Sequence, residues 1–514
     1  MTTISSLGGV QSVTPLSTDT LISRAASPQV PSIAPASTSV LLGQSLSGAS
    51  ASTYTETGAV NDAVSVVMAR NVASRGAGNP FSGVGVALLS RFRTEGGNYS
   101  QWAPARQDVQ AQGVSGTASA ASLQATNTVS LQMTTASGAK VDITLKSGAE
   151  GMAVQIDVTE GALTEDERNA IADLSGAFQD ALDGLAQVPP RLALAGLADM
   201  DTSLLSSVNL RATTQANGLA VQTIEFLADS TQRSLMVSGP DGDIKVSADL
   251  TKAATFGTAE QQAAAVNKYL QQFDAARSRG DGDAALMSLF KDAFATVHSS
   301  YGAAQAQRSQ PEGTVVRVPS SDAHRSLLSG LADFSASIKQ VTQAINPGRR
   351  EEVDGFSFQV SQNSRVAGQA RWNQVVSQDQ QSSLKASFHR SLTPDVKLAL
   401  TTDKSSQNYL YYQIDDTTRS QTDLRFERGV LASATLSQTR NLSMQVSKYV
   451  QGELVDHTVN PTVDSFTRDL LPLFKAANLD EPDKNSRDPR DQVDALMRRR
   501  YLDLAESVAA LRQG

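Results

Sequence analysis

The chain has 514 residues, a formal net charge of −8 and an isoelectric point of about 5.2. That length accommodates about two to four domains. Mild acidity without a basic stripe disfavours a nucleic-acid binder. The absence of cysteine excludes disulfides, thiolate metal sites and cysteine nucleophiles. We expect no transmembrane helix, because no run of ~18 apolar residues occurs. We also expect no secretory signal peptide, because the first residues lack a charged region followed by an apolar one.

Residues 1–58 differ in composition from the rest of the chain. Serine and threonine make up 22 of the first 60 residues, where Asp19, Arg24 and Glu56 are the only charged ones. Such a segment buries too little apolar surface to offset the entropy of ordering, so we expect a disordered tail. It resembles the N-termini of substrates of bacterial type III and flagellar export, which implies an uncleaved export signal. A passive tail on a cytoplasmic protein is the alternative.

Residues 59–102 form the next predicted segment, and it is helical. Apolar residues recur at helical spacing over 59–74 and again over 80–93. The stretch 103–125 is rich in Ala, Gln, Ser and Gly, which is typical of a linker.

Two α+β modules are predicted over 126–302, each with a group of alternating strands followed by helices. Thr164 and Glu167 have the spacing of a capping box at the start of one helix. Pro240-Asp241-Gly242 is typical of a hairpin turn. Because the helix stripes of the two modules match at an offset of 95 residues, we interpret them as an internal duplication.

The segment 303–352 is predicted to be a polar loop followed by a long helix over 321–345. Leu327, Leu331, Phe334 and Ile338 fall on one face of that helix.

An antiparallel β meander is predicted over 353–460, where apolar and polar residues alternate almost without interruption. We expect about eight strands. One of them is expected at 396–400, and the turns at 403–408, 415–421 and 437–441. We interpret Gly429 as a bulge or bend within one longer strand.

The last segment, 461–514, is predicted to contain helices that pack on this sheet. Asn460-Pro461 and Asp488-Pro489 both resemble a helix cap followed by proline at the first helical position. Apolar stripes then continue over 463–478 and 489–511. The predicted fold class is therefore α+β, with antiparallel meander sheets packed against amphipathic helices.

No catalytic residue, metal ligand or cofactor-binding residue is predicted. The histidines are His298, His324, His389 and His457, and none has metal-ligand spacing. Nucleophile elbows and phosphate-binding loops are also missing. A satisfied or solvated side chain is the interpretation favoured for His389, since it sits within a strand.

Tyr409 and Tyr411 are the one candidate surface for a partner or ligand. They alternate with Leu410 and Tyr412, so that strand is expected to be aromatic on both faces. Either helices such as 493–511 cover the second face, or it is an exposed aromatic platform or groove.

Three functional hypotheses follow. The favoured one is a non-enzymatic bacterial structural or interaction protein, exported without a cleaved signal. The second is a module that binds an apolar or lipid-like ligand between sheet and helices. The third is an enzyme whose site assembles from distant residues. A protein partner or an apolar ligand is expected, and neither nucleic acid nor integral membrane association. Nothing in the sequence indicates an oligomeric state.

Overall fold

The computed structural model describes residues 62–74, 79–105, 124–216, 219–301, 327–370, 373–393 and 396–472, all within the unit Ser52–Gly514. The predicted tail, most of the predicted linker and the predicted helix over 489–511 lie outside these residues.

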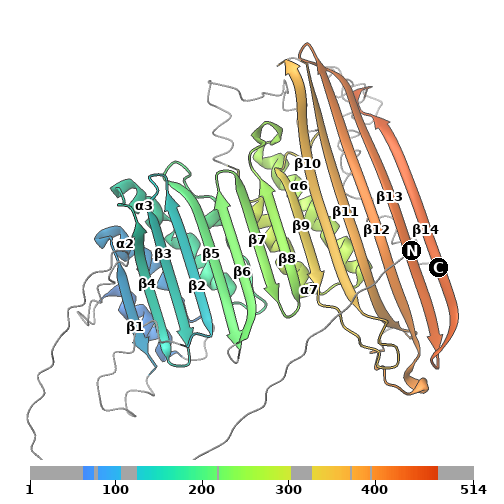
Figure 1. Cartoon of the computed structure of the whole chain (residues 1–514), viewed down its shortest axis with the longest axis horizontal. Helices are drawn as coiled ribbons and strands as arrows, with labels where there is room; N and C mark the ends of the chain where they lie inside the picture. Colours follow the sequence, from blue (N-terminus) through green and yellow to red (C-terminus); the bar gives the residue numbers. More distant parts are fainter. Residues whose placement is uncertain are drawn as a thin grey trace, which may run out of the picture. The chain divides into compact units, whose positions relative to one another are not determined.

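One open antiparallel sheet of 14 strands organises the described chain, and strands hold 48% of its residues (Figure 1). The order across the sheet is β1-β4-β3-β2-β5-β6-β7-β8-β9-β10-β11-β12-β13-β14. The strands are β1 (Tyr99–Pro104), β2 (Asn127–Thr135), β3 (Lys140–Gly148), β4 (Gly151–Glu160), β5 (Leu205–Ala216), β6 (Leu219–Asp229), β7 (Gln232–Gly239), β8 (Gly242–Asp249), β9 (Asp333–Gln340), β10 (Gly355–Ala370), β11 (Asn373–Ser391), β12 (Tyr409–Glu427), β13 (Val430–Val450) and β14 (Glu453–Asp469). The predicted antiparallel sheet is therefore confirmed, but as a single sheet that outweighs the helices.

The helices of the described chain pack against one face of the sheet. They are α1 (Ala63–Ala73), α2 (Val84–Glu95), α3 (Glu165–Asp173), α4 (Ser175–Leu185), α5 (Ala195–Ala198), α6 (Ala259–Gly280) and α7 (Ala284–Val297). Figure 1 shows α6 and α7 beside β7 to β11, where Phe273 of α6 packs against Phe358 of β10 with ring centroids 5.7 Å apart. We call this the helix face, and the opposite one, which carries Ser357 and Lys385, the open face. None of these helices is long and apolar enough to cross a membrane.

Several local predictions are confirmed. The two N-terminal helices form as α1 and α2, and Thr164 and Glu167 make the expected capping box at the start of α3. Pro240 to Gly242 turns the chain between β7 and β8. The structure repeats the predicted order of strands followed by helices, as β2 to β4 with α3 and α4, then β5 to β8 with α6 and α7. The internal duplication itself stays a prediction.

The helix predicted over 321–345 is wrong. Residues 333–340 form β9, which fills the place between β8 and β10 in the sheet. Phe334, Ala336 and Ile338 are buried with a period of two, and this alternation coincides with part of the helical stripe read from the sequence. The segment adopts the strand period of two and not the helical period of 3.6, because it pairs with β8 on one side and β10 on the other.

Five long strands, and not eight shorter ones, occupy the region from β10 to β14. The turns predicted at 415–421 and 437–441 lie inside β12 and β13, where buried polar side chains such as Thr418 and Gln438 face the helix side. Gly429 is not a bulge. Arg428 and Gly429 both have positive φ, 50° and 82°, which is the backbone of a tight type I′ hairpin turn between β12 and β13.

The helix predicted to begin at Pro461 is also wrong, because 453–469 forms β14. Proline lacks the N–H that a central strand donates, so in sheets it is confined mainly to edges. Pro461 sits in the middle of the last strand, opposite Ser443 of β13. A cap-and-proline pattern therefore has a second interpretation, that of an edge strand.

A buried charge cluster joins α6 to the long strands. Asp416 of β12 accepts hydrogen bonds from Arg440 Nε at 3.1 Å and Arg440 Nη2 at 2.8 Å, and also from Arg279 at the end of α6. The exposed fractions of the three side chains are 0% for Asp416, 6% for Arg440 and 5% for Arg279. Removing one member of such a buried group leaves the others without their compensating charge.

We expect Asp416→Asn to lower the free energy of unfolding by about 3–5 kcal/mol, because two buried guanidinium groups lose their shared carboxylate. Asp379→Asn is the matched control, since Asp379 pairs with Arg419 on the exposed side of the neighbouring strand. Chemical denaturation of both variants measures the difference. Equal losses would contradict the role given to the buried cluster.

Candidate functional site

The two tyrosines singled out by the sequence, Tyr409 and Tyr411, lie on the open face of β12 but are not exposed. Their exposed fractions are 0% and 7%. They cluster with Tyr449 of β13, and two leucines of the segment 396–408 pack against the three rings. An exposed aromatic platform therefore does not exist here. Among the described residues, the cover comes from 396–408 and from a second segment, 341–354.

A histidine between two carboxylates fastens the segment 341–354 to the sheet. Nδ1 of His389 lies 2.6 Å from Asp354 Oδ1, and its Nε2 lies 3.1 Å from Glu352 Oε2. The hydroxyl of Tyr409 donates to the same Glu352 oxygen at 2.6 Å. We call Glu352, Asp354 and His389 the latch. The satisfied histidine that the sequence pattern indicated is confirmed, with both ring nitrogens engaged.

Opposing effects set the charges of the latch. Burial lowers the pKa of His389, but the hydrogen bonds and charges of Asp354 and Glu352 outweigh it and leave that pKa raised. Burial raises the pKa of Glu352, yet hydrogen bonds from His389 and Tyr409 bring it below its ordinary value. Burial and the neighbouring Glu352 raise the pKa of Tyr409, so it stays a hydrogen-bond donor. Both ring nitrogens of His389 face carboxylate oxygens, and its raised pKa favours the protonated imidazolium there.

The segment 396–408 is fastened beside the latch by amide side chains. Asn346 and Gln407 exchange two hydrogen bonds of 2.9 Å and 2.8 Å, and Asn346 also donates to the Tyr409 hydroxyl at 3.0 Å. Arg349 lies 4.4 Å above the ring of Tyr449. The strand predicted at 396–400 is wrong, because these residues pair with no strand of the described chain, and Leu398 and Leu400 pack onto the tyrosines instead.

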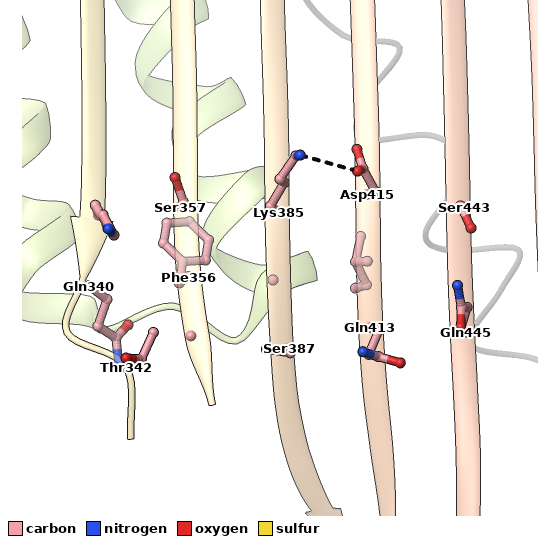
Figure 2. Close-up of a pocket in the computed structure, with 14 residues that line it drawn as sticks. Gln340, Thr342, Phe356, Ser357, Lys385, Ser387, Gln413, Asp415, Ser443 and Gln445 are labelled. Carbon is pink, nitrogen blue, oxygen red and sulfur yellow. Dashed lines mark ion pairs between the residues drawn. The ribbon is translucent and has the colours of Figure 1, made fainter. Parts of the chain in front are cut away.

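A groove of about 320 Å³ opens on the sheet next to these segments. Figure 2 shows side chains from β9 to β13 lining it, and Lys385 reaching towards Asp415, with Nζ and Oδ2 3.6 Å apart. The groove shares a residue with the latch region, since the Ser387 hydroxyl donates to the backbone carbonyl of Val353 at 2.7 Å. Most of its polar lining consists of hydroxyls and amides: Ser357, Ser387, Gln413, Ser443 and Gln445.

The histidine of the latch is unavailable to the groove. The side chain of His389 is 0% exposed and both of its nitrogens are occupied, so it cannot reach a molecule in the groove. The Ser387 hydroxyl of the lining is engaged as well, because it donates to the carbonyl of Val353. Within the described ranges, no three His, Asp or Glu side chains are grouped to hold a metal ion.

An acidic cleft of about 560 Å³ lies between α3 and α5 and is the place where an enzyme site would be sought. Asp166, Asp173, Asp199 and Asp201 line it. Three of them already have partners: Asp173 pairs with Arg93, Asp199 accepts from Ser300, and Asp201 accepts from Ser203. Carboxylates occupied in this way serve the fold, and the cleft contains no paired acid and base.

The apolar-ligand hypothesis places its site between helices and sheet. The cavity between α6 and the long strands measures about 20 Å³, which is room for about one water molecule. Tyr269, Gln272 and Gln380 are among its polar walls. This cavity is far too small for a lipid chain.

The chain matches no protein-family model, and comparison with curated proteins and with solved structures finds no significant similarity. The site must therefore be argued from its own residues. Sequence reasoning located Tyr409 and Tyr411 but missed Glu352 and Asp354. The available signal was three acidic residues, Glu351, Glu352 and Asp354, placed directly before an alternating run that begins at Gly355.

The latch should make stability depend on pH. Because the folded-state pKa of His389 is raised above the unfolded value of about 6.5, its contribution is fully present below pH 6.5 and is lost as the pH rises through the folded pKa. The pKa of Glu352 is lowered in the folded protein, so its contribution to stability is present above the unfolded-state pKa. That contribution is lost as the pH falls through the folded-state pKa.

We expect His389→Gln to lose this pH dependence, which denaturation at pH 5.5 and at alkaline pH measures. His457→Gln is the control, since His457 lies on the exposed strand β14. If the wild type and His389→Gln lost the same free energy of unfolding between pH 5.5 and alkaline pH, the charged latch would be contradicted.

Proposed function

We propose that this protein is a non-enzymatic interaction protein that contacts a protein partner through the open face of β10 to β13. The observation that carries the proposal is the groove on that face, fixed at one end by the latch. Residues of five paired strands, β9 to β13, line the groove, together with Thr342 of the fastened segment 341–354. Little ordering entropy therefore remains to be lost on binding.

The chemistry of this face supports a protein partner over other classes. Charges of both signs are interspersed on it, as in the pairs Lys385–Asp415 and Arg419–Asp379. A nucleic-acid surface would be uniformly basic, and a membrane surface would show a broad apolar patch. Hydroxyl and amide side chains between the charges suit the polar rim of a protein interface, where donors and acceptors are matched.

A photo-reactive residue tests this site in the source organism. We expect benzoylphenylalanine at Gln413, in the groove, to form a discrete cross-linked species. The matched control is the same residue at Val375, which is exposed at the other end of the open face. Lys385→Glu should weaken the cross-link at Gln413, because it places like charges beside Asp415. Adducts of equal yield at both positions, or none at either, would refute the groove as the contact site.

We also propose that the protein is exported without a cleaved signal. This part rests on the Ser/Thr-rich composition of residues 1–58 alone. We expect the full chain to be found in the secreted fraction of the source organism, and a chain lacking residues 1–58 to stay inside the cell. Fractionation with a cytoplasmic marker makes the comparison. Retention of both chains under all growth conditions would leave the segment as a passive tail.

A further inference from the structure

β14 is a long edge strand with no partner on its outer side in the part of the chain that the structure describes. It is last in the strand order and pairs only with β13. Of its 17 residues, 16 are exposed and only Phe466 is half-buried. A free edge of this length presents a row of N–H and C=O groups that another strand can pair with.

The direction of the backbone groups shows which residues are available. Leu470, just beyond the strand, donates its N–H to the carbonyl of Ala434 in β13. Because backbone groups alternate along a strand, even-numbered residues here face β13 and odd-numbered ones face outward. Pro461 belongs to the outward set and lacks an N–H, so it interrupts the row. In the segment Val463–Asp469 beyond it, every outward-facing residue carries a backbone N–H.

This segment is complementary to itself in antiparallel pairing. With Phe466 opposite its own copy, Asp464 falls opposite Arg468 of the second copy, and Arg468 opposite Asp464. Asp464 and Arg468 are both exposed on β14. We infer that two copies of this chain pair edge to edge through 463–469 of β14, with a two-fold axis at Phe466. The inference stands independently of the groove.

A second register also brings unlike charges together and serves as a comparison. Centred on Thr462, it sets Asp456 opposite Arg468 of the other copy. That register places Pro461 within the paired segment, opposite Val463, where the missing N–H removes a ladder hydrogen bond. The register centred on Phe466 leaves Pro461 at its margin.

Charge reversal on the full-length chain tests the pairing, with sedimentation equilibrium as the readout. Wild-type protein should sediment at twice 54.2 kDa. Asp464→Arg and Arg468→Asp each put like charges opposite one another twice, so each should raise the dimer dissociation constant at least about tenfold. An equimolar mixture of the two variants restores both unlike pairs and should form a heterodimer. Circular dichroism confirms that each variant is folded.

Four results would overturn the inference. One is a monomeric wild-type protein at all accessible concentrations. Another is a mixture of the two variants that stays monomeric. The third is a dimer broken by Asp456→Arg and not by Asp464→Arg, which would identify the register centred on Thr462. Growth to a polydisperse aggregate would likewise contradict a closed two-fold pair.

Discussion

One continuous hydrogen-bonded sheet runs through every strand from β1 to β14, and most of its apolar core lies on one face. The helix face is filled by aromatic side chains, with Tyr269 and Phe294 each 5.1 Å from Phe334 of β9. Helices of the described chain pack on that face, whereas the outer strand β14 is exposed along nearly its whole length. The groove, the latch and the free edge of β14 are all consequences of this one-sided packing.

Polar networks take over where the apolar layer thins out along β10 to β12. Gln380 donates to the Tyr269 hydroxyl at 2.8 Å and to Gln362 at 3.0 Å, while Gln378 accepts from the Ser329 amide at 2.9 Å and donates to Ser364 at 3.1 Å. A one-residue slip would move all of these side chains to the wrong face and leave buried amides unpaired. Buried polar pairs of this kind therefore fix the register of strands whose apolar pattern is weak.

The sequence predicted features that depend on neighbours along the chain. The capping box at Thr164 and the hairpin at Pro240 are of this kind, because their partners are three or fewer residues away. It failed where the partner is distant. β9 reads as helix until β8 and β10 are known to flank it, and the polar stretch at 415–421 reads as a turn until the buried Asp416 is seen to meet Arg279. The latch joins residues 35 and 37 positions apart, which no local pattern encodes.

The two ends of the open sheet are protected unequally, and this limits how large an assembly can grow. β1 has only six residues, ends at Pro104, and is held by Tyr99, whose hydroxyl donates to Asp62 beside α1 at 2.7 Å. β14 is nearly three times longer, and its protection is Pro461 with a few charged residues. In an antiparallel two-fold pair, the β14 edges of both copies would be paired with each other, and only the two short β1 edges would remain free. Assembly would then stop at two copies, whereas pairing of β14 with β1 would have no such limit.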